Sequence, residues 1–294
     1  MMTAKEIIEY MESLRDEGQR ANLMRFFKTA PGEYGYGDEF LGLKVPQTRE
    51  VVKAVAKDFP LEEVPELLMS KWHEVRLCGL LILVDKFEKS PLPTSPSRGG
   101  GVKRRRNDDE TIRRRDEIVK MYLQYAERAN NWDLVDLSVH KILGHWLLLP
   151  TFLGIDVYSK EYRAIPTIPD SLDYKRKVLD ELAYSDNLWK QRMSMVCTWK
   201  TSQQGDPSWC LRYAEIHLHH PHDLMHKAVG WMLREMGKRC SMDLLRDFLR
   251  QHAHEMPRTM LRYAIEKMPG TERKEWMAID GRGKKNDGRG NREE

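Results

Sequence analysis

The stretch NNWDLVDLSVHKIL, residues 130–143, decides the fold. Asparagine is a good helix N-cap, so Asn130 or Asn131 can start a helix here. An apolar stripe of that helix is formed by Leu134, Val135 and Ile142. Trp132 and Asp136 are four residues apart, so they lie together on a different face. The stretch therefore predicts an amphipathic helix that directs a tryptophan and a carboxylate away from the core.

Three further stretches open in the same way, with polar residues, a tryptophan near the start and a charged residue within about one turn. They are KWHEVRLCGLLIL at 71–83, DNLWKQRMSMVCTW at 186–199 and HKAVGWMLREMGKRC at 226–240. The four tryptophans are separated by 60, 57 and 42 residues. Paired-helix repeats of the HEAT kind have periods of ~40–47 residues, and insertions can lengthen the first two intervals. The pattern predicts an all-α superhelical solenoid of HEAT-like two-helix repeats.

Changes in composition mark insertions and the end of this repeat domain, which we expect over residues 1–280. Residues 90–110 are rich in Pro, Ser and Gly, which predicts a disordered insertion loop. A second insertion, at 149–171, is expected to be structured. The basic tail at 281–294 has few apolar residues and is expected to be disordered.

The bulk composition, 32% charged and 40% hydrophobic, favours a soluble helical protein. No apolar run approaches the ~18 residues that span a bilayer, and the N-terminus lacks the apolar core of a secretory signal. The four cysteines form no CxxC pair, which indicates free thiols in a reducing compartment. We therefore expect a cytoplasmic protein without a membrane partner.

Charge alone does not identify a partner, because the formal net charge is only +4. Basic runs occur at 103–106 and 113–115, but acidic residues at 108–110 lie between them. These runs are interpreted as a solvated loop.

Two interpretations are open for Trp132 and Asp136: a packed tryptophan beside a solvated aspartate, or a functional face near the positive end of a helix. Arg192 also lies near a helix start, after a cap formed by Ser185 or Asp186. The helix dipole disfavours a cation there. A bound phosphate would relieve this conflict, and so would an ion pair with an Asp or Glu of another repeat.

Lys227, Trp231 and Arg234 follow one another at i, i+4 and i+7, so they share a helix face. A core position is the alternative for Trp231. Gly230 in mid-helix would let another backbone approach closely. In the earlier stretch, residues 72–76 are interpreted as structural packing.

Other chemistry is not indicated. The chain has no glycine-rich phosphate loop and no HExxH motif. The histidines of HLHHPH, residues 217–222, lack a cysteine and a standard ligand spacing, so they are interpreted as a polar turn between helices. We expect neither a metal nor a cofactor.

The sequence resembles the AlkD-type DNA alkylation-repair glycosylases, a family of HEAT-like repeats, over most of residues 1–270. The motifs that carry the resemblance are FLGLKVPQTRE at 40–50, KWHEVRLCGL at 71–80, NWDLVD at 131–136, LGHWLL at 143–148, SDNLWKQR at 185–192 and HKAVGWMLRE at 226–235. The resemblance implies that Asp136 is the essential carboxylate, with Trp132 and Trp231 as catalytic-cleft tryptophans. It implies DNA binding by Arg192, Lys227, Arg234 and Trp189.

The resemblance also implies a monomer that binds double-stranded DNA with alkylated bases on a concave face. It would excise cationic purines such as 3-methyladenine and 7-methylguanine. Such a base leaves as a neutral molecule, so one carboxylate that stabilises the oxocarbenium-like sugar suffices. No lysine is placed for a Schiff base, so a monofunctional enzyme that leaves an abasic site is expected. The target base is expected to stay largely in the stack, because a shallow solenoid groove offers no deep pocket.

Two other functions stay open, since a fold does not prove an activity. One is a non-catalytic HEAT-like scaffold that binds DNA or protein, which would tolerate the loss of Asp136. The other is a protein-interaction solenoid, which would need no basic lining.

Overall fold

The computed structural model describes residues 2–90, 106–148 and 172–279. These residues are helical apart from turns, loops and one isolated β-bridge between Glu39 and Trp72. The prediction of an all-α protein is confirmed. The chain divides into two compact units, residues 1–197 and 198–294, which are described separately. A single repeat domain over 1–280 stays a prediction, and the expectations for 149–171 and 281–294 lie outside the described residues.

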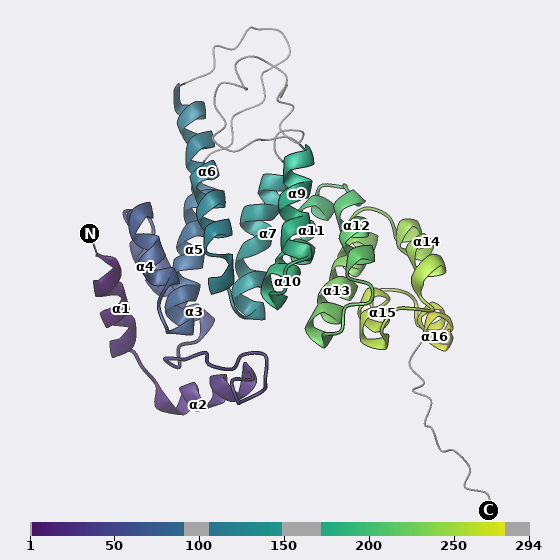
Figure 1. Cartoon of the computed structure of the whole chain (residues 1–294), viewed down its shortest axis with the longest axis horizontal. Coiled ribbons are helices and arrows are strands. Elements are labelled where there is room, and N and C mark those ends of the chain that lie inside the picture. Colours follow the sequence, from purple (N-terminus) through teal and green to yellow (C-terminus); the bar gives the residue numbers. More distant parts are fainter. Residues whose placement is uncertain (1, 91–105, 149–171, 280–294) are drawn as a thin grey trace, which may run out of the picture. The chain divides into compact units, whose positions relative to one another are not determined.

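The first unit consists of successive helix pairs (Figure 1). Its helices are α1 (Ala4–Ser13), α2 (Glu17–Phe26), α3 (Val45–Val55), α4 (Val64–Leu68), α5 (His73–Lys89), α6 (Arg106–Gln124), α7 (Trp132–Leu148), α9 (Leu172–Ala183) and α10 (Leu188–Val196), with short 3-10 helices at Leu61–Glu63 and Ala126–Arg128. The second helices of successive pairs pack side by side, α5 against α7 and α7 against α10. Each also packs against the first helix of its own pair, which is α4, α6 or α9. This order is the one expected for two-helix repeats.

The apolar stripe predicted for residues 130–143 is confirmed, because Leu134, Val135 and Ile142 are fully buried in α7. The cap predicted for the 186–199 stretch is wrong. Asn187 fills that position, and its Oδ1 accepts hydrogen bonds from the backbone N–H groups of Trp189 (2.9 Å) and Lys190 (3.1 Å). Ser185 instead accepts a hydrogen bond from the Asn187 backbone, 3.2 Å away.

The expected insertion loop is shorter than predicted, because α6 already begins at Arg106. Residues 91–105 lie outside the described part of the chain. Arg115 also corrects the interpretation of the second basic run, since this side chain is buried. It donates hydrogen bonds to the carbonyls of Phe87 and Ser90 at the end of α5. The last carbonyls of a helix lack hydrogen-bond donors within the helix, and the Arg115 guanidinium provides such donors here.

A loop outside the helix pairs positions the site. Residues 27–44 connect α2 to α3 and lie at the N-terminal ends of α5 and α7 (Figure 1). Glu74, in the first turn of α5, accepts hydrogen bonds from the backbone N–H groups of residues 41–43 at 2.8–3.0 Å. Gly42 has a φ of 95°, and a Cβ there would lie 2.1 Å from the Asp16 carbonyl oxygen. Only glycine allows this close passage of the loop past the start of α2.

The second unit is built around one long helix. Its helices are α11 (Thr198–Gln203), α12 (Ser208–Ile216), α13 (Asp223–Arg239), α14 (Met242–His252), α15 (Arg258–Ala264) and α16 (Gly270–Ala278). Helix α13 packs against α11, α12, α14 and α15. The prediction for Gly230 is confirmed, because a Cβ there would lie 2.4 Å from the Met260 carbonyl oxygen of α15. None of the described helices combines the length and the apolar character of a membrane span.

Candidate active site

Trp132 and Asp136 lie together in the first turns of α7. Asn131 precedes the helix, and its Oδ1 accepts a hydrogen bond from the Trp132 backbone N–H at 2.9 Å. Both side chains are half-buried, and both form part of the wall of a cavity of about 430 Å³ in the first unit. The spacing that sequence reasoning singled out therefore brings a tryptophan and a carboxylate to one cavity.

Arg192 of α10 forms a bidentate ion pair with Asp136. Its Nε donates to Oδ1 at 2.9 Å and its Nη2 donates to Oδ2 at 2.8 Å. The Arg192 side chain is 6% exposed and the Asp136 side chain 17%. Of the two interpretations of Arg192, an ion pair between repeats is present, whereas its contact with a phosphate stays a prediction.

The electrostatic environment of Asp136 contains opposing influences. Burial, which disfavours the charged form, is the largest and raises the pKa of this carboxyl group above its ordinary value. The charge and hydrogen bonds of Arg192 lower the pKa in part, and the nearby Asp133 raises it. The result is a carboxyl group that is held in one orientation and is easier to protonate than an ordinary aspartate.

Aromatic side chains from the 27–44 loop and the end of α2 form a second part of the wall. The Trp132 ring stacks on Phe27, with centroids 5.3 Å apart, and meets Phe26 edge-on at 5.8 Å. Phe27 in turn stacks on Phe40 at 5.2 Å. Sequence reasoning did not find these phenylalanines, although Phe40 opens one of the quoted motifs. The adjacent aromatic residues Phe26 and Phe27 are the feature of the sequence that could have indicated this aromatic wall.

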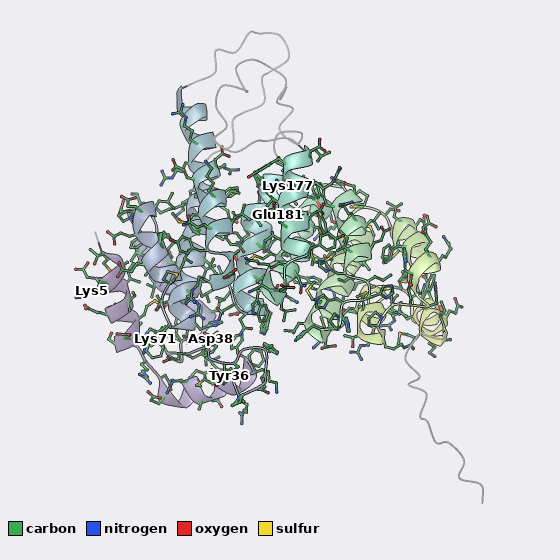
Figure 2. The ribbon with its side chains drawn as sticks, in the orientation of Figure 1. Lys5, Tyr36, Asp38, Lys71, Lys177 and Glu181 are labelled. Carbon is green, nitrogen blue, oxygen red and sulfur yellow. The ribbon has the colours of Figure 1, made fainter. Side chains whose placement is uncertain are left out.

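A buried charge cluster connects this loop to both helix starts. His73 Nδ1 lies 2.8 Å from Asp38 Oδ2, and its Nε2 lies 2.9 Å from Asp133 Oδ2. Burial disfavours a charged imidazole, but Asp133 and Asp38 outweigh it and raise the pKa of His73 to about 9. Arg76 also contacts Asp38 and donates to the carbonyls of residues 70 and 71. Figure 2 labels Asp38 where the loop approaches the start of α5, with Lys71 nearby.

The sequence interpretation of residues 72–76, which include His73 and Arg76, is structural packing. Trp72 and Arg76 are indeed buried, so that interpretation of 72–76 is confirmed. What it missed is the ionic role of His73, whose partners lie 35 and 60 positions away in the chain. Local spacing carries no signal for such distant pairs.

Trp189, predicted to bind DNA, is buried and lies edge-on to Tyr34 at 6.0 Å. Its DNA contact stays a prediction that this position does not support. A packed indole provides hydrophobic contact within the first unit instead.

The remaining predicted site residues belong to the second unit. Trp231, Lys227 and Arg234 are all half-buried on one face of α13, as their spacing predicts. Trp231 is tilted against Trp199, with centroids 5.6 Å apart. Lys227 pairs with Asp223 at 2.7 Å, and Arg234 pairs with Glu235 and Glu266. Their contacts with DNA stay predictions.

The histidine-rich stretch forms the turn between α12 and α13, as interpreted. His217 is buried, which lowers its pKa to about 4. His222 caps α13, because its Nδ1 accepts a hydrogen bond from the Leu224 backbone N–H at 3.1 Å. In the part of the chain that the structure describes, no three His, Cys, Asp or Glu side chains are grouped so as to hold a metal ion.

The fold and the carboxylate-bearing cavity define a helical-repeat protein with a candidate catalytic site. Among solved structures, the chain is similar to a predicted DNA alkylation repair enzyme from Enterococcus faecalis. The identity is 12% and the TM-score 0.59, over 87% of this chain and 97% of that one, a likeness that concerns the fold alone. No curated protein is significantly similar in sequence. The sequence model of the family described as DNA alkylation repair enzyme matches residues 7–153 and 165–268. The chain belongs to this family, which assigns it a role in the repair of alkylated DNA.

Proposed function

We propose that this protein is a monofunctional DNA N-glycosylase that excises cationic alkylated purines and leaves an abasic site. The observation that carries the proposal is the shared cavity wall of Trp132 and Asp136, in a chain that belongs to the DNA alkylation repair enzyme family. A carboxylate repels the phosphates of DNA. Beyond its ion pair with Arg192, Asp136 therefore benefits a DNA-binding protein where positive charge develops, as it does during base excision.

The reaction needs little beyond such a carboxylate. In a purine alkylated at N3 or N7, the bond from the sugar C1′ to N9 breaks and its electron pair moves to the base. The base leaves as a neutral molecule, and the sugar becomes an oxocarbenium-like cation. Water then adds to C1′ and releases a proton. Because the leaving group is already neutral, no general acid has to protonate it.

Asp136 would stabilise that cation through its negative charge, in a half-buried site where electrostatic interactions are stronger than in water. Arg192 would act as a positioning residue, since its two hydrogen bonds fix the plane of the carboxylate. Each carboxylate oxygen can accept more than one hydrogen bond, so the ion pair leaves room for an interaction with the sugar or with the attacking water.

The aromatic and basic residues complete the proposal. Trp132 would contact the deoxyribose with its ring face, which attracts a developing positive charge, and Trp231 would act as a further aromatic residue of the catalytic cleft. Arg192, Lys227 and Arg234 would contact double-stranded DNA, whereas the buried position of Trp189 does not favour such a contact, and the protein would act as a monomer. Substrates would include 3-methyladenine and 7-methylguanine.

The test is the variant Asp136→Asn, which keeps the shape of the side chain and removes its charge. Single-turnover release of 7-methylguanine from methylated duplex DNA should fall by about 10²-fold or more, the cost typical of losing one electrostatic contact to a transition state. Affinity for the duplex, measured by fluorescence anisotropy, should stay within about twofold. Asp243→Asn is the matched control, because this aspartate also pairs with an arginine but is exposed.

Wild-type excision by Asp136→Asn would refute the assigned role of the carboxylate. Absence of base release from the wild-type protein, together with binding to DNA, would favour the non-catalytic scaffold.

A further inference from the structure

His73, in the first turn of α5, contacts both the loop and the helix that form the site. Its Nδ1 lies 2.8 Å from Asp38 Oδ2 in the loop between α2 and α3, and its Nε2 lies 2.9 Å from Asp133 Oδ2 in α7. The His73 side chain is buried, and this residue belongs to the same cavity wall as Trp132 and Asp136. The chemistry proposed for excision leaves His73 without a role.

Asp133 depends on His73 for the balance of its charge. Asp133 is buried, and His73 is the only basic side chain that pairs with it among the described residues. Asp38, in contrast, also contacts Arg76. A buried charge that loses its partner is strongly destabilising, because nothing compensates it. The position of the α7 turn that carries Asp133 therefore depends on the proton of His73.

The same turn of α7 carries the two residues of the proposed chemistry. Trp132 directly precedes Asp133, and Asp136 follows it three positions later, a spacing that makes neighbours on a helix. Burial raises the pKa of Asp136 most, and the negative charge of Asp133 raises it further. A displacement of Asp133 would therefore change both the position and the electrostatic environment of Asp136.

A chain of stacked rings provides a second connection from His73 to Trp132. The imidazole stacks on Phe40, with centroids 4.4 Å apart, and lies 5.0 Å from the Phe27 ring. Phe27 in turn stacks on Trp132 at 5.3 Å. The faces of aromatic rings attract cations, so a charged imidazole favours these contacts. His73 is thus connected to Trp132 both through α7 and through Phe27.

The other charged or titratable groups around this cluster come from several elements. They are Asp38 in the loop, Glu74 and Arg76 in α5, Lys44 at the start of α3, Tyr122 in α6 and Arg192 in α10. Arg76 contacts Asp38 and Arg192 pairs with Asp136, so neither arginine replaces His73 at Asp133.

We propose that His73 is a positioning residue of this site: in its charged form it holds Asp133 and the Phe27 ring, and through them it keeps Trp132 and Asp136 in the arrangement that excision requires. The inference deepens the proposed function and rests on it. Burial disfavours the charged imidazole, but Asp133 and Asp38 outweigh burial and raise the pKa of His73 to about 9. The ring is therefore charged at neutral pH and loses its charge in the alkaline range.

The first test is the pH dependence of single-turnover release of 7-methylguanine, with circular dichroism to verify at each pH that the full-length protein is folded. The wild-type rate should fall about tenfold between pH 8 and 10, because small displacements of reacting groups are costly. His73→Gln should be about tenfold slower at pH 7 and should lack this alkaline limb. His254→Gln, which replaces an exposed histidine, should retain the limb and the wild-type rate.

Asp133→Asn distinguishes this role from a general contribution to stability, and it decides alone if His73→Gln does not fold. Without the negative charge of Asp133, the pKa values of His73 and Asp136 should both fall. The alkaline limb and the acid limb of the rate profile should therefore both move to lower pH. Asp243→Asn, which replaces an exposed aspartate, should leave both limbs in place.

The second test does not depend on activity. The part of the tryptophan emission that disappears in Trp132→Phe reports on the surroundings of Trp132. In the wild type it should change with a midpoint near pH 9, and in Asp133→Asn the midpoint should lie at lower pH. In His73→Gln the emission should not change over this range.

The emission separates this inference from the proposed function. If no protein releases a base but the emission of Trp132 follows these midpoints, the glycosylase proposal fails and the positioning role stands. The role is overturned if this emission stays constant between pH 8 and 10 in the wild type. It is also overturned if His73→Gln keeps the wild-type rate and alkaline limb, or if Asp133→Asn leaves both limbs unmoved.

Discussion

Asp136 illustrates at the scale of one residue how the site balances stability against reactivity. Burial raises its pKa above the ordinary value of 3.8, and Arg192 counteracts this in part. The pKa of Asp136 is therefore higher in the folded protein than in the unfolded chain, so protonation of this carboxyl group stabilises the fold. This stabilisation is fully present below the unfolded pKa. It is lost as the pH rises through the folded pKa. An ionised Asp136 therefore costs stability at neutral pH, as expected for a group that serves chemistry rather than folding.

The raised pKa of Asp136 leads to a prediction for the pH dependence of excision. The rate should fall as the pH decreases through the raised pKa of Asp136, because only the carboxylate stabilises a cation. Arg192→Gln removes a charge that lowers this pKa, so the acid limb of the pH–rate profile should move to higher pH. Lys190→Gln, on the same helix but paired with the exposed Glu127, should leave the limb in place. An acid limb in Arg192→Gln at or below that of the wild type would contradict the assignment.

Gly230 supports a prediction for packing. A Cβ at this position would lie 2.4 Å from the Met260 carbonyl oxygen and 2.6 Å from Tyr263 Cβ, so α13 and α15 would have to separate. Gly230→Ala should lower the free energy of unfolding by about 1–3 kcal/mol, measured by urea denaturation. Gly18→Ala is the control, because a Cβ there makes only an ordinary contact and alanine favours the helix. Equal stability of the two variants would show that the helices are not in close contact.

Sequence reasoning was strongest for residues whose roles are set by local spacing. The pairing of Trp132 with Asp136 and the close approach at Gly230 both follow from helical geometry within a few positions. The partner of Arg192 lies 56 positions away, and only the fold selects Asp136 from the many acidic residues. The cap at Asn187 was missed because Ser185, Asp186 and Asn187 are all good caps.

At the scale of elements, the 27–44 loop packs at the N-terminal ends of α5 and α7 and forms part of the cavity wall there. It supplies Phe27 and Phe40 to the wall, and its Asp38 is fixed by His73 and Arg76. Figure 2 labels Tyr36, which lies just before Asp38 in this loop and has an exposed side chain. Helical periodicity cannot predict such a segment, because its conformation depends on buried ion pairs with distant helix starts.

The charge cluster makes the anchoring of this loop pH-dependent. The pKa of His73 is raised from 6.5 to about 9, so its stabilising charge is fully present below 6.5 and is lost as the pH rises to about 9. The free energy of unfolding should therefore decrease over this window, by at most about 3 kcal/mol. Urea denaturation at a series of pH values measures this change.

His73→Gln should abolish this decrease and should also be less stable at pH 6.5. His254→Gln, which replaces an exposed histidine, should retain it. A wild-type stability that does not change between pH 6.5 and 9 would show that His73 is uncharged in the fold.

At the scale of the whole molecule, repeated helix pairs were predictable because each pair has its own apolar stripes. The four tryptophan-bearing stretches correspond to α5, α7, α10–α11 and α13. Membership of the DNA alkylation repair enzyme family agrees with the motifs quoted from those stretches. The cavity was not predictable, since it arises where the loop, α2, α5 and α7 meet.

DNA binding by the whole chain should depend strongly on salt if basic residues contact phosphates. Lys227→Gln should reduce the slope of log affinity against log salt concentration by about 0.9, the value for one phosphate contact. Lys5→Gln, which removes an exposed lysine at the N-terminus, should leave the slope unchanged. An unchanged slope in Lys227→Gln would remove this residue from the DNA-binding surface.

The most direct measurement is an analysis of the products formed from duplex DNA that contains a single 7-methylguanine. The wild-type protein should release the free base while the strand stays intact until alkali cleaves it at the abasic site. Asp136→Asn should release almost none. A strand cut without alkali would contradict a monofunctional enzyme, and a wild-type protein that binds this DNA but releases no base would contradict the proposed glycosylase.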